Sequence, residues 1–89
     1  MNGIKFKIQR FDDGNIENRP IKIIGFNVLN DTEDQSIYRE TVLSSDDFNG
    51  KTPEQCVDFA FNKLSSSLAE SANVILTSGQ VLGSYYIPN

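Results

Sequence analysis

The first stretch of the chain alternates apolar and polar side chains. From Ile4 to Phe11 the apolar residues fall at nearly every second position, with lysine, glutamine and arginine between them. A period of two is typical of a strand with one buried face. The segment that follows, DDGNIENRP, is rich in residues that favour turns. The pattern therefore predicts a strand that ends near Phe11.

Two further apolar segments predict strands over Ile21–Leu29 and Ile37–Leu43. The first has apolar residues on both faces, and Gly25 in its middle indicates a bulge or a close approach of another group to the backbone. In the second, Tyr38 and Val42 share one face, and Ile37, Thr41 and Leu43 share the other. Polar connections between the three segments favour an antiparallel meander.

Beyond residue 52 the apolar spacing changes to that of a helix. Apolar residues recur three and four positions apart and predict a helix from Pro53 to about Ala72. Val74–Thr77 fits either a continuation of this helix or a short strand. The tail, Val81–Ile87, is β-branched and aromatic, so we expect a last strand that Pro88 closes.

These elements together predict an α+β fold. We expect an antiparallel sheet of three to four strands, in the order strand, strand, strand, helix, strand, with one helix on one face. At 89 residues the chain is expected to form a single domain over residues 1–89.

Gly50-Lys51-Thr52 has the sequence that ends a phosphate-binding P-loop. The first glycine of that motif should occupy position 45, where the chain has Ser45. The alternative is a helix start, because Thr52 is a good N-cap, Pro53 suits the first helical position, and Gln55 completes a capping box. We prefer the helix start and expect no nucleotide or other cofactor.

Composition narrows the chemistry further. The chain has no histidine and one cysteine, Cys56. This removes the Ser-His and Cys-His nucleophile pairs, intrachain disulfides and the usual zinc sites. Cys56 is expected to be a packed, inert thiol, and the aspartate clusters fit turn chemistry, so we expect no catalytic residues and no metal.

The net charge of −4 is unevenly distributed. Residues 1–29 hold five basic and three acidic side chains, whereas residues 30–89 hold three basic and nine acidic ones. An acidic chain is repelled by phosphate backbones, so we expect no nucleic-acid partner. The sequence also contains no signal-like or membrane-spanning apolar run, and we expect neither a membrane partner nor a small-molecule substrate.

One predicted helix can cover only one face of the predicted sheet. An aromatic, apolar face left open on a small domain is typical of an interface. The alternative is that the tail and the loop over residues 12–20 fold over this face. The interface would consist of residues from the strands and the tail: Phe11, Tyr38, Val42, Tyr85, Tyr86 and Ile87. We therefore expect a non-catalytic assembly or interaction subunit that self-associates, forming a homo-oligomer, or docks on a larger protein.

Two other functions stay open at this stage. The first is an acidic regulator or inhibitor that covers a basic surface of a partner, through Asp31, Glu33, Asp34, Asp46 and Asp47. The second is a small enzyme that works without histidine. Frequent asparagine and isoleucine, with no tryptophan, suggest an AT-rich coding source. We accordingly expect a small viral or phage protein, located in the cytoplasm or the virion.

Overall fold

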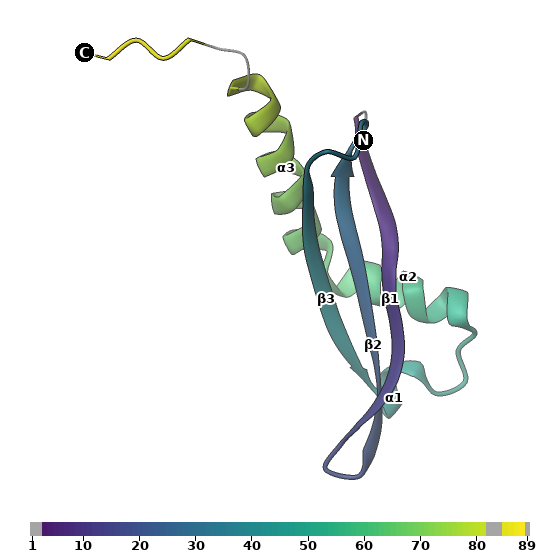
Figure 1. The fold of residues 1–89 in the computed structure, drawn as a ribbon. Coiled ribbons are helices and arrows are strands. Elements are labelled where there is room, and N and C mark those ends of the chain that lie inside the picture. The colour runs from purple at the N-terminus through teal and green to yellow at the C-terminus, as the bar shows by residue number, and fades with distance from the viewer. Residues whose placement is uncertain (1–2, 82–84, 89) are drawn as a thin grey trace.

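The fold is seen in a computed structural model that describes residues 3–81 and 85–88. Three strands form one antiparallel sheet in the order β1-β2-β3, and helices follow them in the sequence (Figure 1). The predicted α+β class is thus confirmed. The elements are β1 (Ile4–Ile16), β2 (Arg19–Asn30), β3 (Ser36–Ser44), α1 (Ser45–Phe48), α2 (Pro53–Lys63) and α3 (Ser65–Val81).

β1 runs past the predicted end at Phe11 and continues to Ile16. The turn lies instead at Glu17 and Asn18, which both have positive φ, 50° and 64°. Two such residues form the tight turn whose twist matches that of a β-hairpin. The polar residues before the turn therefore pair with β2, and Asp13 accepts a 2.6 Å hydrogen bond from Lys22 Nζ.

The helices of the described ranges lie on one side of the sheet (Figure 1). Between them and the sheet lies the core, in which Ile24, Phe26 and Val28 of β2 are each at most 2 % exposed. From the helices, the core takes Cys56, Ala60, Leu68, Ala72 and Ile75. Cys56 is 1 % exposed, as expected for a packed thiol.

The predicted single helix is two helices, α2 and α3, with a break at Leu64. Leu64 leaves the helical region with ψ near 5°. The ambiguous segment Val74–Thr77 is helical, since Ile75 is 4 % exposed and extends the buried stripe of Leu68 and Ala72. Burial of Ile75 against the sheet explains why the helix wins over the local strand propensity.

The predicted fourth strand is wrong where the structure describes it. Val81 is the last residue of α3, and Tyr85–Pro88 have no regular secondary structure. The remaining residues of that prediction, 82–84, lie outside the described ranges. A hydrophobic segment of this length needs a neighbouring strand edge to form a strand, and this tail extends away from the sheet (Figure 1).

The start of α2 confirms the capping box. Thr52 Oγ1 accepts a 3.2 Å hydrogen bond from the Gln55 backbone N–H, and Gln55 Oε1 accepts a 2.9 Å bond from the Thr52 N–H. Lys51 Nζ donates to the Asp47 carbonyl and lies 4.7 Å from the centroid of the Phe59 ring. The P-loop-like residues therefore have structural partners within the protein.

Thr52→Ala should lower the free energy of unfolding by about 1 kcal/mol, because the Gln55 N–H loses its acceptor. Urea denaturation followed by circular dichroism measures this change. Thr77→Ala is a suitable control, since the Thr77 hydroxyl donates to the carbonyls of Asn73 and Val74 in its own helix. An equal loss in both variants would contradict a specific role for the cap.

Candidate interaction surfaces

The sheet face opposite the helices is formed by alternate residues of each strand. On β2 these are the odd-numbered positions from Ile21 to Leu29, and on β3 they include Tyr38, Glu40 and Val42. Tyr38 and Val42 are each 38 % exposed. Both lie on the predicted face, and no helix of the described chain covers them (Figure 1).

Tyr38 leans across the sheet onto Gly25 of the central strand. A Cβ atom at Gly25 would lie 2.5 Å from Cζ of the Tyr38 ring, so only glycine leaves room for this contact. Partial burial of the tyrosine and the neighbouring Glu40 carboxylate raise the pKa of Tyr38 above its ordinary value of 10.0. Gly25 thus marks a close approach, one of the two outcomes predicted for it.

Charged groups on the same face pair with one another. Arg10 on β1 forms ion pairs with Asp12 at 2.6 Å and with Glu40 on β3 at 3.3 Å. Its hydrogen bond to Asp12 is the main cause of a raised Arg10 pKa. Nearby, Asn27 donates a 3.1 Å hydrogen bond to Gln9. On β1 the open face therefore carries Arg10 and Asp12 and, next to the hairpin, the exposed Ile16, and on β3 its exposed apolar groups are Tyr38 and Val42.

Phe11 does not lie on the open face, contrary to the prediction. The register of β1 shifts between Ile8 and Arg10, at a β-bulge. The extra residue turns Phe11 to the helix side, where it pairs with Ile24 and lies 5.5 Å from Lys22 Nζ. A bulge moves every later side chain to the other face, which is why simple alternation misplaced Phe11.

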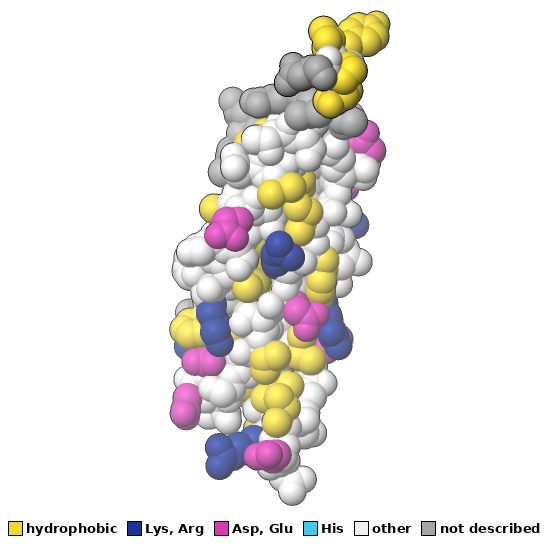
Figure 2. Space-filling model, turned by 90° about the vertical axis from the view of Figure 1, so that its left-hand side faces the viewer, with side chains coloured by type: hydrophobic (Ala, Val, Ile, Leu, Met, Phe, Trp, Pro, Cys, Tyr) yellow, Lys and Arg dark blue, Asp and Glu magenta, His cyan; other side chains and the backbone are white. Residues whose placement is uncertain are grey.

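The predicted tail residues form an exposed apolar segment. Tyr85, Tyr86 and Ile87 are 95 %, 87 % and 82 % exposed. On the side of the molecule at the left of Figure 1, hydrophobic side chains lie in separate patches between charged and polar ones (Figure 2). The tail is thus the most exposed apolar segment of the described chain, and it lies apart from Tyr38 and Val42.

The acidic candidates fall into two separate groups. Asp31, Glu33 and Asp34 lie in the β2–β3 loop, whereas Asp46 and Asp47 lie in α1 at the other end of β3. The nine residues of β3 separate the groups by about 30 Å. Asp34 accepts hydrogen bonds from Asn30 and Thr32, which lower its pKa below the ordinary 3.8. The five acids therefore do not form one continuous surface.

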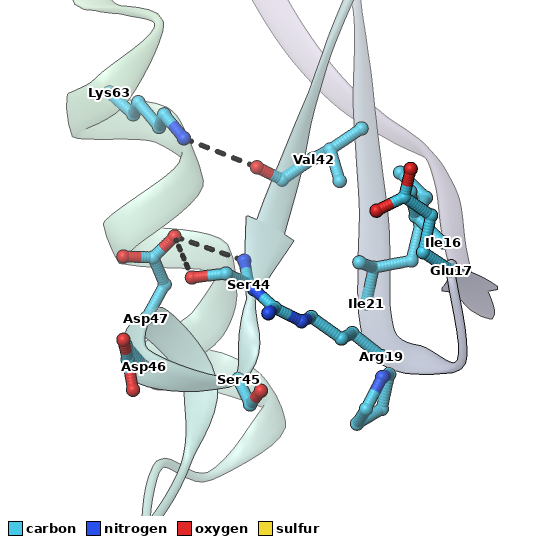
Figure 3. A pocket seen from close by; sticks show the side chains of 11 residues that line it. Ile16, Glu17, Arg19, Ile21, Val42, Ser44, Ser45, Asp46, Asp47 and Lys63 are labelled. Atoms are coloured by element: carbon cyan, nitrogen blue, oxygen red, sulfur yellow. Dashed lines mark hydrogen bonds between the residues drawn. The ribbon is translucent and has the colours of Figure 1, made fainter.

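An open hollow of about 470 Å³ lies where β3 ends and the β1–β2 hairpin extends beyond it (Figure 3). Its charged lining combines Glu17, Asp46 and Asp47 with Arg19 and Lys63. Lys63 Nζ donates a 3.1 Å hydrogen bond to the Val42 carbonyl, and Asp47 holds the start of α1 (Figure 3). At least two of these charged groups are thus used to join the helices to the edge of β3.

Asp47 accepts two hydrogen bonds from Ser44, from its backbone N–H at 3.0 Å and from its hydroxyl at 3.1 Å. The backbone bond is the largest cause of a pKa below the ordinary 3.8. A carboxyl with a lowered pKa is ionised at neutral pH and is a poor general acid. The geometry thus favours a helix cap over acid–base chemistry at this position.

The lowered pKa of Asp47 predicts a pH dependence of stability. The stabilising contribution is present above the unfolded-state pKa near 3.8 and is lost as pH falls through the still lower folded-state pKa. Asp47→Asn should therefore lose less stability than the parent chain between pH 5 and pH 2. Urea denaturation across this range measures the difference, and Asp46→Asn is the control. If the free energy of unfolding falls equally with pH in both variants, Asp47 does not contribute to the pH dependence of stability.

Sequence reasoning missed a groove beside α2. It is lined on β1 by Ile8 and Phe11 and on α2 by Pro53, Val57 and the acidic residues Glu54 and Asp58. The sequence carried one signal for it, the spacing of three between Ile8 and Phe11, which breaks the period of two and is typical of a bulge.

Comparison with protein-family models, with curated proteins and with solved structures finds no match. Within residues 3–81 and 85–88, no helix is long and apolar enough to span a membrane. In the same ranges, no three carboxylate or thiol groups come together as ligands for one metal ion.

Proposed function

We propose that this chain is a non-catalytic assembly or interaction subunit that self-associates, or docks on a larger protein, through the open face of its sheet and its tail. One observation carries the proposal. The described helices all pack on one side of a three-stranded sheet, and Tyr38 and Val42 stay exposed on the other (Figure 1).

The surroundings of Tyr38 and Val42 suit a protein partner. Aromatic and apolar side chains are enriched in the centre of interfaces, where unpaired charges are rare. The Arg10–Glu40 ion pair crosses the sheet between Tyr38 and Val42, so the charge in this area is already paired when a partner covers it. Because Tyr38 is already held against Gly25, little side-chain entropy would be lost when a partner covers it.

Light scattering over a range of concentrations tests the proposal. We expect the mean mass to rise above the 10.0 kDa of one chain as concentration increases. Val42→Glu should weaken this association, because it places an unpaired charge at the centre of the interface. Val74→Glu is the matched control, since Val74 is 51 % exposed on α3. A monomeric mass at every concentration would contradict self-association.

A further inference from the structure

The groove beside α2 is an open apolar hollow of about 400 Å³ along the outer side of β1. Ile8 is 53 % exposed and Phe11 37 % exposed, although both face the helix side of the sheet. The bulge at Gln9 brings these two side chains to the same face, three positions apart. An apolar surface of this kind gains free energy when another apolar group covers it.

The groove runs beside an unpaired strand edge. β1 is at the edge of the sheet and pairs with β2 alone within the described chain. Its outer edge therefore presents backbone N–H and C=O groups that an added strand can bind. In strand addition, the backbone supplies hydrogen bonds and a neighbouring pocket receives every second side chain of the added segment.

The tail has the properties that such a site requires. Tyr85-Tyr86-Ile87 is uncharged, aromatic and β-branched, and it is more than 80 % exposed at each residue. In an extended segment, Tyr85 and Ile87 point to one side and Tyr86 to the other. Pro88 ends the segment, because it has no N–H to donate to a strand.

The tail cannot reach the groove of its own chain without unwinding α3. Near its end, α3 lies against Asp34–Ile37, at the end of the sheet where β1 begins. Phe11 is seven residues along β1 from Ile4, about 23 Å away, and on the opposite edge of the sheet. The four residues from Val81 to Tyr85 span at most about 14 Å, and the tail points away from the sheet (Figure 1).

We propose that the tail of one copy adds as a strand to the β1 edge of the next, with Tyr85 and Ile87 in the groove and Tyr86 on the open face. Glu54 and Asp58, which also line the groove, can accept hydrogen bonds from the hydroxyl of Tyr85. The segment Tyr85-Tyr86-Ile87 has no charged side chain. If the β1 strand of a second copy were added at this edge instead, lysines of the two strands would lie against each other.

This inference rests on the self-association proposed above, and it specifies which two surfaces of the copies meet. Each copy has one tail and one groove at different places on its surface, so the contact is heterologous. Heterologous contacts build rings when the rotation closes and open filaments when it does not. Pairing through the open face, which is an independent contact, would add to this growth.

Two variants test the contact by light scattering. A chain that ends at Ser84 lacks the tail, and Ile8→Lys places a charge in the groove. Each should weaken self-association about tenfold or more, as expected for removal of a central anchor. Val74→Lys is the control, because Val74 is 51 % exposed on α3 and lies outside both the groove and the open face. It should assemble like the parent chain.

Mixing the two variants gives the decisive result. The truncated chain keeps a groove and the Ile8→Lys chain keeps a tail, so the mixture should form larger species than either variant alone. A mixture whose mass equals the average of its components would overturn the tail contact. If association of the truncated chain matches that of the parent but Val42→Glu still weakens it, the tail contact is wrong and the open-face interface stands.

The alternation of side chains along the extended tail supplies a further test. Tyr85→Ser and Ile87→Ser should each weaken assembly more than Tyr86→Ser, because only the first two side chains enter the groove. All three residues are more than 80 % exposed, so none of these variants should alter folding of the single chain. Equal effects at the three positions would contradict strand addition in this orientation.

Discussion

Phe26→Ala should lower the free energy of unfolding by about 3–5 kcal/mol, the range for deleting a buried phenylalanine ring. Phe26 is 2 % exposed on the central strand. Its ring meets Phe61 edge to face at 5.5 Å, and Phe61 meets Phe6 in the same way at 5.2 Å. The substitution thus removes the aromatic contact between the central strand and Phe61 of α2.

A loss of this size is a large fraction of the stability of a small domain, which is typically about 5–15 kcal/mol in total. Urea denaturation followed by circular dichroism gives the midpoint and the slope for each variant. Phe11→Ala is the control, because Phe11 is 37 % exposed at the edge of the sheet and should cost far less. If both substitutions cost the same, the centre of the core does not lie at Phe26.

The three strands and the start of α2 could be predicted from the sequence because their signals are local. Alternation and turn residues define a strand from side chains that are close in sequence. The capping box at Thr52 is likewise local, since Thr52 and Gln55 bind each other's backbone. These features did not depend on knowing what the helices pack against.

The errors arose where distant parts of the chain decide the outcome. β1 extends to Ile16 because β2 supplies pairing partners for its polar residues, such as Lys22 for Asp13. Val74–Thr77 belongs to α3, in which Ile75 is buried against the sheet, although this segment has high strand propensity. In both cases tertiary contacts override a local preference.

The candidate interface was predicted in part. Tyr38 and Val42 lie on the open face because β3 contains no bulge and its alternation holds from Ser36 to Ser44. Phe11 was misplaced by the single extra residue at Gln9. The groove needs both that bulge and the position of α2, and the second of these cannot be derived from the strand pattern.

Gly25→Ala is expected to displace the Tyr38 ring and to lower the free energy of unfolding by about 1–3 kcal/mol, the usual cost of overpacking. The new Cβ would lie 2.5 Å from Cζ of Tyr38, far inside van der Waals contact. Once the ring moves into water, the pKa of Tyr38 should fall back towards 10.0. Denaturation in urea and an absorbance titration of tyrosine measure the two effects.

The double variant Gly25→Ala with Tyr38→Ala isolates the contact. Without the ring there is nothing to displace, so alanine at position 25 should be neutral or stabilise the strand by about 0.5–1 kcal/mol. The same cost in both backgrounds would show that Gly25 is required for another reason. The double-mutant cycle also matters for testing the interface. Because the Tyr38 ring contacts Gly25, Tyr38→Ser would change folding and binding together. Val42, which pairs with Ile23 and not with Gly25, is therefore the better position for testing the interface.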